Sequence, residues 1–335
     1  MASTALSLVL AACIPTVQHA GRQLDGFQGP RFEIAAHKFI TFDGAELGLS
    51  AWLPPQGQEP WAVIVALHGM NDYGEAFFPA GPYFAERGVA VFAYDARGFG
   101  RSPNRGVWGG ERLMTEDART ALAVARRLYP HATLGVIGDS MGAATAIATF
   151  GADNAPRVDR LVLVAPAVWG WSSMPTAYSL TLWAGAHTFP WRPVTAPRGV
   201  VRRIIASDNA EMLRRIGRDR NMIFATRIDA LYGLVNLMEA AAQRSDRLQG
   251  DIAFLYGAHD QIIPRASALK AAQRLPANAR TAVYPDGYHM LLRDLHASVV
   301  YEDILAFLRD ADAPFPSRAP PLRPAQPARV AQANH

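Results

Sequence analysis

Residues 133–150 read Thr-Leu-Gly-Val-Ile-Gly-Asp-Ser-Met-Gly-Ala-Ala-Thr-Ala-Ile-Ala-Thr-Phe. The run from Thr133 to Ile137 predicts a short buried strand, and the small residues after Gly142 predict a helix that packs closely against it. The Gly-x-Ser-x-Gly pentapeptide between them predicts a sharp turn that exposes the hydroxyl of Ser140. A serine flanked by glycines also occurs in ordinary turns, so the strand and helix around it make this pentapeptide informative.

On both sides of this turn, short apolar runs alternate with helix-length segments, which is typical of a parallel sheet covered by helices. The expected strands are 61–67, 89–94, 133–137, 160–164, 252–256 and 281–284, and the expected helices are 75–87, 115–129, 141–150 and 297–308. Asp43-Gly44 is a hairpin turn signal between strands at 39–42 and 47–53. The sequence therefore predicts an α/β fold whose mostly parallel sheet begins with an antiparallel hairpin.

The alternation stops between residues 167 and 249, where four tryptophans and several prolines precede helix-like segments. Ligands of open α/β sheets bind at the carboxyl ends of the strands, so an insertion after the strand that ends at Val164 can cover that site. We expect 31–166 and 250–310 to form the core, 167–249 a helical cap, and 1–30 a signal and linker. Residues 311–335 contain six prolines without apolar periodicity and are expected to be disordered.

A serine hydroxyl becomes a strong nucleophile only when a base accepts its proton, so a histidine and an orienting carboxylate should follow Ser140. Asp260 lies in a polar loop after the strand that ends at Tyr256, and His289 lies in a loop after the next strand. This order and the placement of all three residues at strand ends predict a catalytic triad. Taken alone, Asp260 could cap the following helix, and His289 could be a surface histidine.

Three neighbouring residues are weaker candidates for the same roles. Asp286 is close to His289 in sequence and His259 adjoins Asp260, but neither fits the expected strand-end geometry as well. His296 is expected to begin the last helix.

Acyl transfer also needs N–H donors directed at the developing oxyanion. Met141 directly follows Ser140 and would supply one backbone N–H, and Met70, in His68-Gly69-Met70-Asn71 after the strand 61–67, would supply the second. The side chains of the two methionines could form flexible apolar walls of a site or simply pack in the core.

Residues 95–102, Asp-Ala-Arg-Gly-Phe-Gly-Arg-Ser, contain two glycines of a dinucleotide-binding fingerprint. Pro103 stands where the third glycine would be, and no helix is expected to start there, so we interpret this stretch as a structural turn. The sequence has no Gly-Lys-Ser phosphate loop and no paired-histidine metal spacing, and no cofactor or metal is expected.

The composition excludes a disordered chain, because 50% of the 335 residues are hydrophobic and only 19% are charged. The formal net charge is +4, and residues 167–249 hold 11 Arg against six acidic residues. This segment could lean toward an anionic surface, although 31 Arg against two Lys also fits a bias of the whole genome. No aromatic residues interleave a basic cluster, so nucleic acid is not an expected partner.

Cys13 is the only cysteine, which excludes an intramolecular disulfide. The apolar run before it is too short to span a bilayer, and Leu10-Ala11-Ala12-Cys13 resembles a bacterial lipobox, whose cysteine receives a lipid anchor. The first basic residue is Arg22, so the usual positive n-region is missing. We expect a lipidated Cys13 and membrane attachment in the cell envelope; the alternative is an incidental cysteine in a cytoplasmic protein.

Several of these motifs together resemble the monoacylglycerol lipase and lysophospholipase branch of the α/β-hydrolases, also called serine-aminopeptidase-like hydrolases. They are His68-Gly69, residues 95–102, Gly138 to Gly142, residues 257–260 and Tyr288-His289, and the resemblance covers about Phe32 to Leu308. It implies an α/β-hydrolase fold with Ser140 as nucleophile, Asp260 as acid and His289 as base. It also implies that the amides of Met70 and Met141 form the oxyanion hole.

Two positions depart from the family pattern. Asp139 stands where such lipases often carry His or Glu, and Ala143 where they often carry a second Gly. The cap resembles the family least, which leaves the choice of substrate open.

The expected reaction is hydrolysis of a small acyl ester through an acyl-enzyme, as in monoacylglycerol lipases or lysophospholipases. An aminopeptidase-type serine hydrolase is an alternative that would need carboxylates in the cap, such as Asp208 and Glu211, to bind the substrate amine. A third reading is a fold of this type that binds a ligand without catalysis. The sequence leaves acyl chain length, head group and oligomeric state open.

Overall fold

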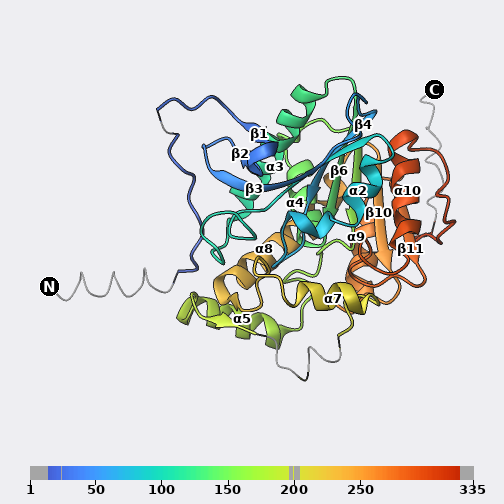
Figure 1. Cartoon of the computed structure of the whole chain (residues 1–335). Coiled ribbons are helices and arrows are strands. Elements are labelled where there is room, and N and C mark those ends of the chain that lie inside the picture. The colour runs from blue at the N-terminus through green and yellow to red at the C-terminus, as the bar shows by residue number, and fades with distance from the viewer. Residues whose placement is uncertain (1–13, 24, 196–198, 200–203, 325–335) are drawn as a thin grey trace, which may run out of the picture.

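The computed structural model describes residues 14–23, 25–195, 199 and 204–324. Its centre is a nine-stranded sheet in the order β1-β2-β3-β5-β4-β6-β7-β10-β11 (Figure 1). The strands are β1 (Arg31–Glu33), β2 (Lys38–Ile40), β3 (Glu46–Trp52), β4 (Ala62–Leu67), β5 (Val89–Tyr94), β6 (Thr133–Asp139), β7 (Arg160–Val164), β10 (Ile252–Gly257) and β11 (Arg280–Tyr284). Pairing is antiparallel from β1 to β5 and parallel from β5 to β11, which confirms the predicted sheet with its leading hairpin.

Helices cover both faces of this sheet, and two separate apolar clusters fill the space beneath them. Helices α3 (Glu111–Leu128), α4 (Met141–Phe150) and α9 (Arg265–Arg274) contribute to one cluster, and α2 (Ala80–Ala85) and α10 (Ala297–Arg309) contribute to the other. Short 3-10 turns, η1 (Ile34–Ala36) and η2 (Gly74–Phe77), lie between strands. Along β4 the side chains alternate between the two clusters, and all six are buried, as expected for a central strand of a parallel sheet.

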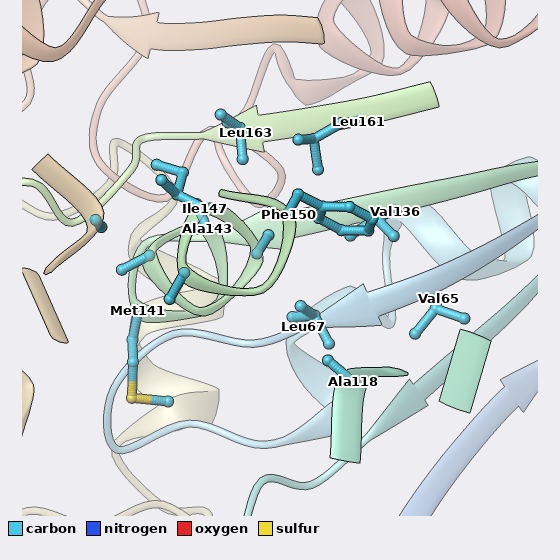
Figure 2. Close-up of a cluster of buried hydrophobic side chains, with 14 of the residues drawn as sticks. Val65, Leu67, Ala118, Val136, Met141, Ala143, Ile147, Phe150, Leu161 and Leu163 are labelled. Atoms are coloured by element: carbon cyan, nitrogen blue, oxygen red, sulfur yellow. The ribbon is translucent and has the colours of Figure 1, made fainter. Parts of the chain in front are cut away.

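Helix α4 directly follows the predicted turn, and all ten of its residues are buried. Figure 2 shows Ile147 and Phe150 of α4 among Val136, Leu161 and Leu163 of the neighbouring strands. A Cβ atom on Gly142 would lie 1.9 Å from the carbonyl oxygen of Leu67. Only glycine therefore lets α4 approach β4 this closely, which fixes the position of the turn before the helix.

The helix predicted at 75–87 is wrong in detail, because the structure divides it into η2 and α2. Pro79 lies between the two pieces and has no N–H to continue the hydrogen-bond ladder of a helix. The other predicted helices form, although α3 begins four residues earlier than expected, at Glu111.

The segment between β7 and β10, which we call the insertion (residues 165–251), contains three described helices and a small sheet. These elements are α5 (Thr176–Thr188), β8 (Pro193–Val194), α7 (Ala210–Ile216), β9 (Thr226–Arg227), α8 (Ile228–Arg244) and η3 (Ser245–Arg247). The antiparallel pair β8 and β9 was not predicted, since two-residue strands leave no periodicity in the sequence. Helix α8 packs on α4 of the core and on α5 (Figure 1).

The carboxyl-terminal end of the described chain is held against the core. The expectation of a disordered segment from residue 311 is wrong for 311–324, because Leu322 is buried and the guanidinium of Arg323 donates to the carbonyl oxygens of Ala272, Leu275 and Ala279. These carbonyls give the segment specific partners that its composition did not reveal. Residues 325–335 lie outside the described residues.

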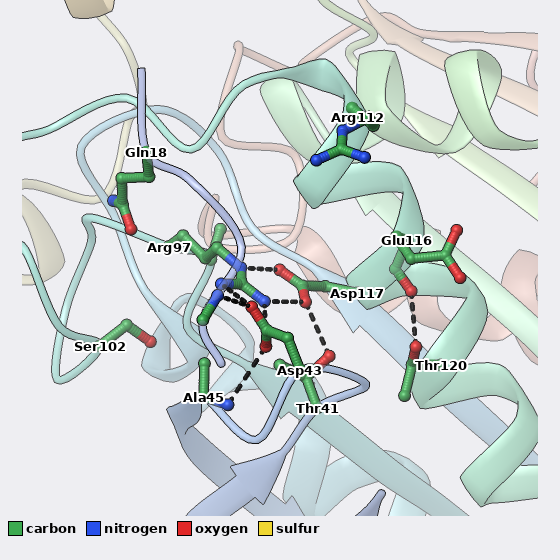
Figure 3. Close-up of polar contacts among 12 residues, drawn as sticks. Gln18, Thr41, Asp43, Ala45, Arg97, Ser102, Arg112, Glu116, Asp117 and Thr120 are labelled. Carbon is green, nitrogen blue, oxygen red and sulfur yellow. Dashed lines mark hydrogen bonds and ion pairs between the residues drawn. The ribbon is translucent and has the colours of Figure 1, made fainter. Parts of the chain in front are cut away.

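Residues 95–102 form a turn, as predicted, and Arg97 at its centre ties three elements together (Figure 3). The buried Arg97 guanidinium pairs with Asp43 in the hairpin turn at 2.8 Å and with Asp117 of α3 at 2.7 Å. Thr41 donates to the same Asp117 carboxylate at 2.7 Å. This network fixes the hairpin to the first long helix.

Replacing Arg97 by methionine should therefore lower the free energy of unfolding strongly. The variant leaves two buried carboxylates without their cation, and breaking a buried ion pair from one side costs about 3–5 kcal/mol. Arg126→Met is a matched control, because Arg126 of α3 pairs with Asp159 at the surface and should change stability by less than about 1 kcal/mol. Urea denaturation of both variants measures the difference, and equal effects would contradict this account of Arg97.

Candidate active site

Ser140 occupies the turn between β6 and α4 with φ 52° and ψ −111°, a backbone conformation that side-chain-bearing residues rarely adopt. Gly138 makes this turn possible, because a Cβ atom there would lie 2.5 Å from the Cα of Ala143. The first helical hydrogen bond runs from the Ala144 N–H to the Ser140 carbonyl. The serine therefore stands at the amino end of α4, where the first backbone N–H groups have no partner within the helix.

The structure brings Ser140, His289 and Asp260 together in one hydrogen-bonded chain. His289 Nε2 lies 3.0 Å from Ser140 Oγ, and His289 Nδ1 lies 2.8 Å from Asp260 Oδ2. The three residues follow β6, β11 and β10, whose parallel pairing brings their carboxyl ends to one edge of the sheet. This geometry lets His289 accept the serine proton while Asp260 holds the opposite ring nitrogen.

The loop around Asp260 uses both oxygens of the carboxylate. Oδ2 faces His289, and Oδ1 accepts the backbone N–H groups of Ile262 and Ile263 at 2.8 and 2.9 Å. These bonds fix the carboxylate in one orientation. Asp260 thus does not cap α9, which begins at Arg265 after Pro264.

The weaker candidates lie elsewhere. His259 and Asp286 are exposed, and the His259 ring packs on Tyr288. His296 is the N-cap residue of α10, as predicted. In the insertion, Asp208 accepts the Leu295 N–H and Glu211 is exposed on α7, so neither side chain lines the cavity at Ser140.

The two predicted oxyanion donors belong to the segments that flank Ser140. Met141 is the first residue of α4, and its side chain is buried in the core (Figure 2). Met70 follows β4 and lines the same cavity as Ser140. His68 holds this loop, because its Nδ1 lies 2.7 Å from the Gly69 carbonyl oxygen and its Nε2 accepts the Ala96 N–H at 2.8 Å. Burial lowers the pKa of His68, which favours the neutral ring that this pattern requires.

A cavity of about 410 Å³ opens from Ser140 beneath the insertion. Its walls are mainly apolar, and most of the large apolar side chains in them come from the insertion. These side chains are Trp169, Met174, Leu182, Leu231, Leu234, Val235 and Met238. The cavity is therefore shaped to hold an apolar group next to the serine hydroxyl.

Three buried charged residues that also line the cavity, Asp72, Asp139 and Arg293, were not predicted as site residues. Asp72 forms an ion pair with Arg293, and Asp139 lies beside Ser140 with one carboxylate oxygen that has no hydrogen-bond partner in the described part of the chain. Burial raises the pKa of Asp139 to about 6, although the charges of Arg293 and His289 oppose this rise. Of these three residues, only Asp139 was noted in the sequence, where it departs from the family pattern.

The environment of His289 favours its charged form. Burial alone lowers the pKa of this histidine, but the hydrogen bond and the charge of Asp260 outweigh burial and raise the pKa above its ordinary value. The site is thus built to stabilise the imidazolium that forms when His289 takes a proton.

Across the described ranges, no group of three His, Cys, Asp or Glu side chains is arranged to hold a metal ion. No helix among the same residues is long and apolar enough to cross a bilayer. The lipidation predicted at Cys13 lies outside the described residues.

A strand-turn-helix with a serine at the turn, and an acid and a histidine after later parallel strands, define an α/β-hydrolase. The family model described as "Serine aminopeptidase, S33" matches residues 58–296. The chain belongs to this family.

Individual proteins are similar to this chain over most of their length. A monoacylglycerol lipase of Mycolicibacterium smegmatis is 24% identical over 293 residues, which cover 81% of this chain and 96% of the relative. A soluble variant of monoglyceride lipase from Saccharomyces cerevisiae, solved with a substrate analog, has a TM-score of 0.70 at 15% identity and covers 88% of this chain and 99% of that one. A carboxyl esterase of Bacillus coagulans, solved with glycerol, has a TM-score of 0.64 at 22% identity over 81% of this chain and 96% of that one.

Proposed function

We propose that this chain is a serine hydrolase that cleaves carboxylic esters of apolar acyl chains, with monoacylglycerols or lysophospholipids as its substrate class. The observation that carries the proposal is the hydrogen-bonded chain from Asp260 through His289 to Ser140, which opens into an apolar cavity. The similarity to a monoacylglycerol lipase over most of both chains supports the ester class.

The proposed reaction has two steps. Ser140 Oγ attacks the ester carbonyl as His289 Nε2 takes its proton, and His289 then gives this proton to the departing alcohol. The N–H groups of Met70 and Met141 stabilise the oxyanion, and a donor of this kind contributes about 3–4 kcal/mol to the transition state. Water, activated by His289, then releases the acyl group from Ser140 and restores the free hydroxyl.

Peptidase activity is the alternative within the family. It would need a carboxylate in the insertion near the substrate's amine, and neither Asp208 nor Glu211 lines the cavity. The mainly apolar wall instead supports an acyl chain as the group that fills it.

An activity panel tests the proposal and its alternatives directly. Short and long nitrophenyl esters, monoacylglycerols, lysophospholipids and aminoacyl amides are assayed with the natural protein and with Ser140→Ala. We expect serine-dependent turnover of the long-chain esters. Turnover of the amides in preference to the esters would favour a peptidase, and no serine-dependent turnover of any compound would favour a ligand-binding protein.

The apolar cavity predicts that chain-length preference can be altered from the insertion. Leu234→Trp should fill part of the cavity and lower kcat/KM for a long-chain monoacylglycerol by about tenfold or more, because each buried methylene contributes about 0.8 kcal/mol. Hydrolysis of an acetate ester should change little. Leu234→Ala, which enlarges the same cavity, is the companion variant for comparison. Equal losses for acetate and long chains in Leu234→Trp would contradict the assignment of this cavity to the acyl chain.

The raised pKa of His289 predicts the acid side of the pH profile. His289 must be neutral to accept the serine proton, so kcat/KM should fall as pH drops through the pKa of the free enzyme. Because Asp260 raises this pKa, the midpoint should lie above 6.5, the ordinary value for histidine. Initial rates on a non-ionising ester give the midpoint, and circular dichroism at each pH checks that the protein stays folded. A midpoint at or below 6.5 would contradict the coupling to Asp260.

A further inference from the structure

The loop that carries Met70 forms a tight turn beside the nucleophile. The Asp72 N–H donates to the Gly69 carbonyl oxygen at 3.3 Å, which closes a four-residue turn over 69–72. A Cβ atom on Gly69 would lie 3.5 Å from the Cβ of Ser140. No backbone carbonyl among the described residues accepts the Met70 N–H. This turn, which we call the oxyanion loop, therefore sets where the Met70 N–H lies relative to Ser140.

The shape of the oxyanion loop depends on the backbone of Asn71. Asn71 is the third residue of the turn and has φ 65°, and a positive φ at this position is what a type II turn requires. Glycine adopts such a conformation without strain, and asparagine tolerates it better than most residues do. A left-handed residue other than glycine persists where its surroundings hold it in place. The partners of Asn71 therefore decide the position of the loop.

These partners come from the insertion. The Ile223 N–H donates to the Asn71 carbonyl oxygen at 3.0 Å, and the Asn71 side-chain amide donates to Thr226 Oγ1 at 2.8 Å. Thr226 is buried and lies 155 residues from Asn71 in the sequence. The insertion thus holds both the backbone and the side chain of the residue that shapes the oxyanion loop.

The part of the insertion that contacts Asn71 is itself fixed to the core. We call residues 219–226 the bridging segment. Its Asp219 accepts the hydroxyl of Tyr73, which follows the oxyanion loop, at 2.6 Å. The Arg105 guanidinium donates at 2.7 to 3.0 Å to three successive carbonyl oxygens, those of Arg220, Asn221 and Met222. These bonds give the bridging segment a defined position from which it can support the loop.

The bridging segment contacts the loop rather than the place where an acyl chain would bind. Met70 lines the cavity at Ser140, but neither Asn71 nor Thr226 is among the residues that line it. A change at Asn71 or Thr226 therefore leaves the apolar walls of the cavity as they are. It alters the support of the N–H donor next to the reacting carbonyl.

From these contacts we propose that Asn71 is a positioning residue, through which Thr226 of the insertion holds the Met70 N–H where oxyanion stabilisation requires it. The inference rests on the proposed function, because it adds a residue to the same acyl transfer. Removing an oxyanion donor outright lowers kcat by about 10²–10³-fold, and a misplacement of about 1 Å can cost about 10²-fold. Loss of the support from Thr226 should therefore lower the rate by about tenfold or more.

Thr226→Val tests this contact, because it replaces the hydroxyl by a methyl group and keeps the shape of the side chain. We expect kcat/KM for a monoacylglycerol to fall by about tenfold or more. Thr226→Ser keeps the hydroxyl and should stay within about twofold of the natural protein. Thr120→Val is the matched control, since Thr120 of α3 is also buried and donates to the Glu116 carbonyl, and its kcat/KM should be unchanged. Thermal unfolding of each variant checks that it is folded.

Asn71→Gly removes the same contact from the other side. Glycine keeps the left-handed backbone without strain but has no amide to donate to Thr226. The loss of kcat/KM should match that of Thr226→Val. The double variant should lose no more than either single variant, because both replacements remove one interaction. Losses that multiply in the double variant would overturn the inference.

A transition-state analogue separates donor positioning from substrate binding. With a long-chain trifluoromethyl ketone, Ser140 Oγ adds to the carbonyl carbon, the serine proton passes to His289 Nε2, and the carbonyl oxygen becomes the oxyanion. We expect Thr226→Val to weaken inhibition by this ketone by the same factor as kcat/KM. Binding of the matching alkyl ether, which has no carbonyl, should be unchanged. Equal weakening of ketone and ether would overturn the inference.

The natural protein and Ser140→Ala distinguish failure of this inference from failure of the proposed function. Serine-dependent ester turnover that is unchanged in Thr226→Val would overturn the role of Asn71 alone. Absence of serine-dependent turnover of any ester would overturn both.

Discussion

Replacing Ser140 by alanine should lower kcat for ester hydrolysis by about 10⁴-fold or more. Loss of the nucleophile in a triad leaves only the contribution of binding and of the oxyanion donors. The backbone turn should survive, because serine and alanine face the same steric cost at φ 52°. The stability of the variant should therefore stay close to that of the natural protein.

The measurement is kcat on a nitrophenyl ester and on a monoacylglycerol, with thermal unfolding of the same samples. Ser267→Ala in α9 is a matched control that removes a buried serine hydroxyl away from the cavity, and its kcat should be unchanged. Residual activity of Ser140→Ala within tenfold of the natural protein would exclude Ser140 as the nucleophile.

Asp260→Asn should lower kcat by about 10⁴-fold at neutral pH while preserving the shape of the site. The asparagine amide can donate a hydrogen bond to His289 Nδ1, which favours the ring form with its proton on Nε2. Nε2 then cannot accept the proton of Ser140, from which it lies 3.0 Å away. The loss of the negative charge should also move the acid side of the pH profile to lower pH, because Asp260 raises the pKa of His289.

Asp286→Asn is the natural control, since it makes the same chemical change to an exposed carboxylate three residues before His289. Its kcat should remain within about twofold of the natural protein, as expected for a surface change. Equal losses for both variants, or an unchanged pH midpoint in Asp260→Asn, would contradict the role given to Asp260.

The sheet and the predicted triad could be placed from the sequence because each depends on a local pattern. Six buried apolar runs predicted the parallel strands, and Ser140, Asp260 and His289 each follow one of these strands. The carboxyl ends of parallel strands lie at one edge of the sheet. The position of each residue after its strand was therefore enough to predict that the three residues, although far apart in sequence, lie close together.

Other features depend on pairings that leave no local pattern. Asp72 and Arg293 are 221 residues apart. Charged residues are usually exposed, so the sequence alone predicts a surface position for each of them. Arg323 likewise binds carbonyl oxygens nearly 50 residues away, so a proline-rich composition predicted disorder where the chain is docked. The strands β8 and β9 are too short to show a period, and only the fold of the insertion brings them together.

Labelling with a fluorophosphonate, followed by mass spectrometry of the peptides, tests the proposed nucleophile most directly. The reagent forms a stable bond to an activated serine, so we expect one adduct per chain, located on the peptide that contains Ser140. Labelling should be absent in Ser140→Ala and strongly slowed in His289→Ala. An active protein that carries no adduct, or carries it on a residue other than Ser140, would contradict the proposed mechanism.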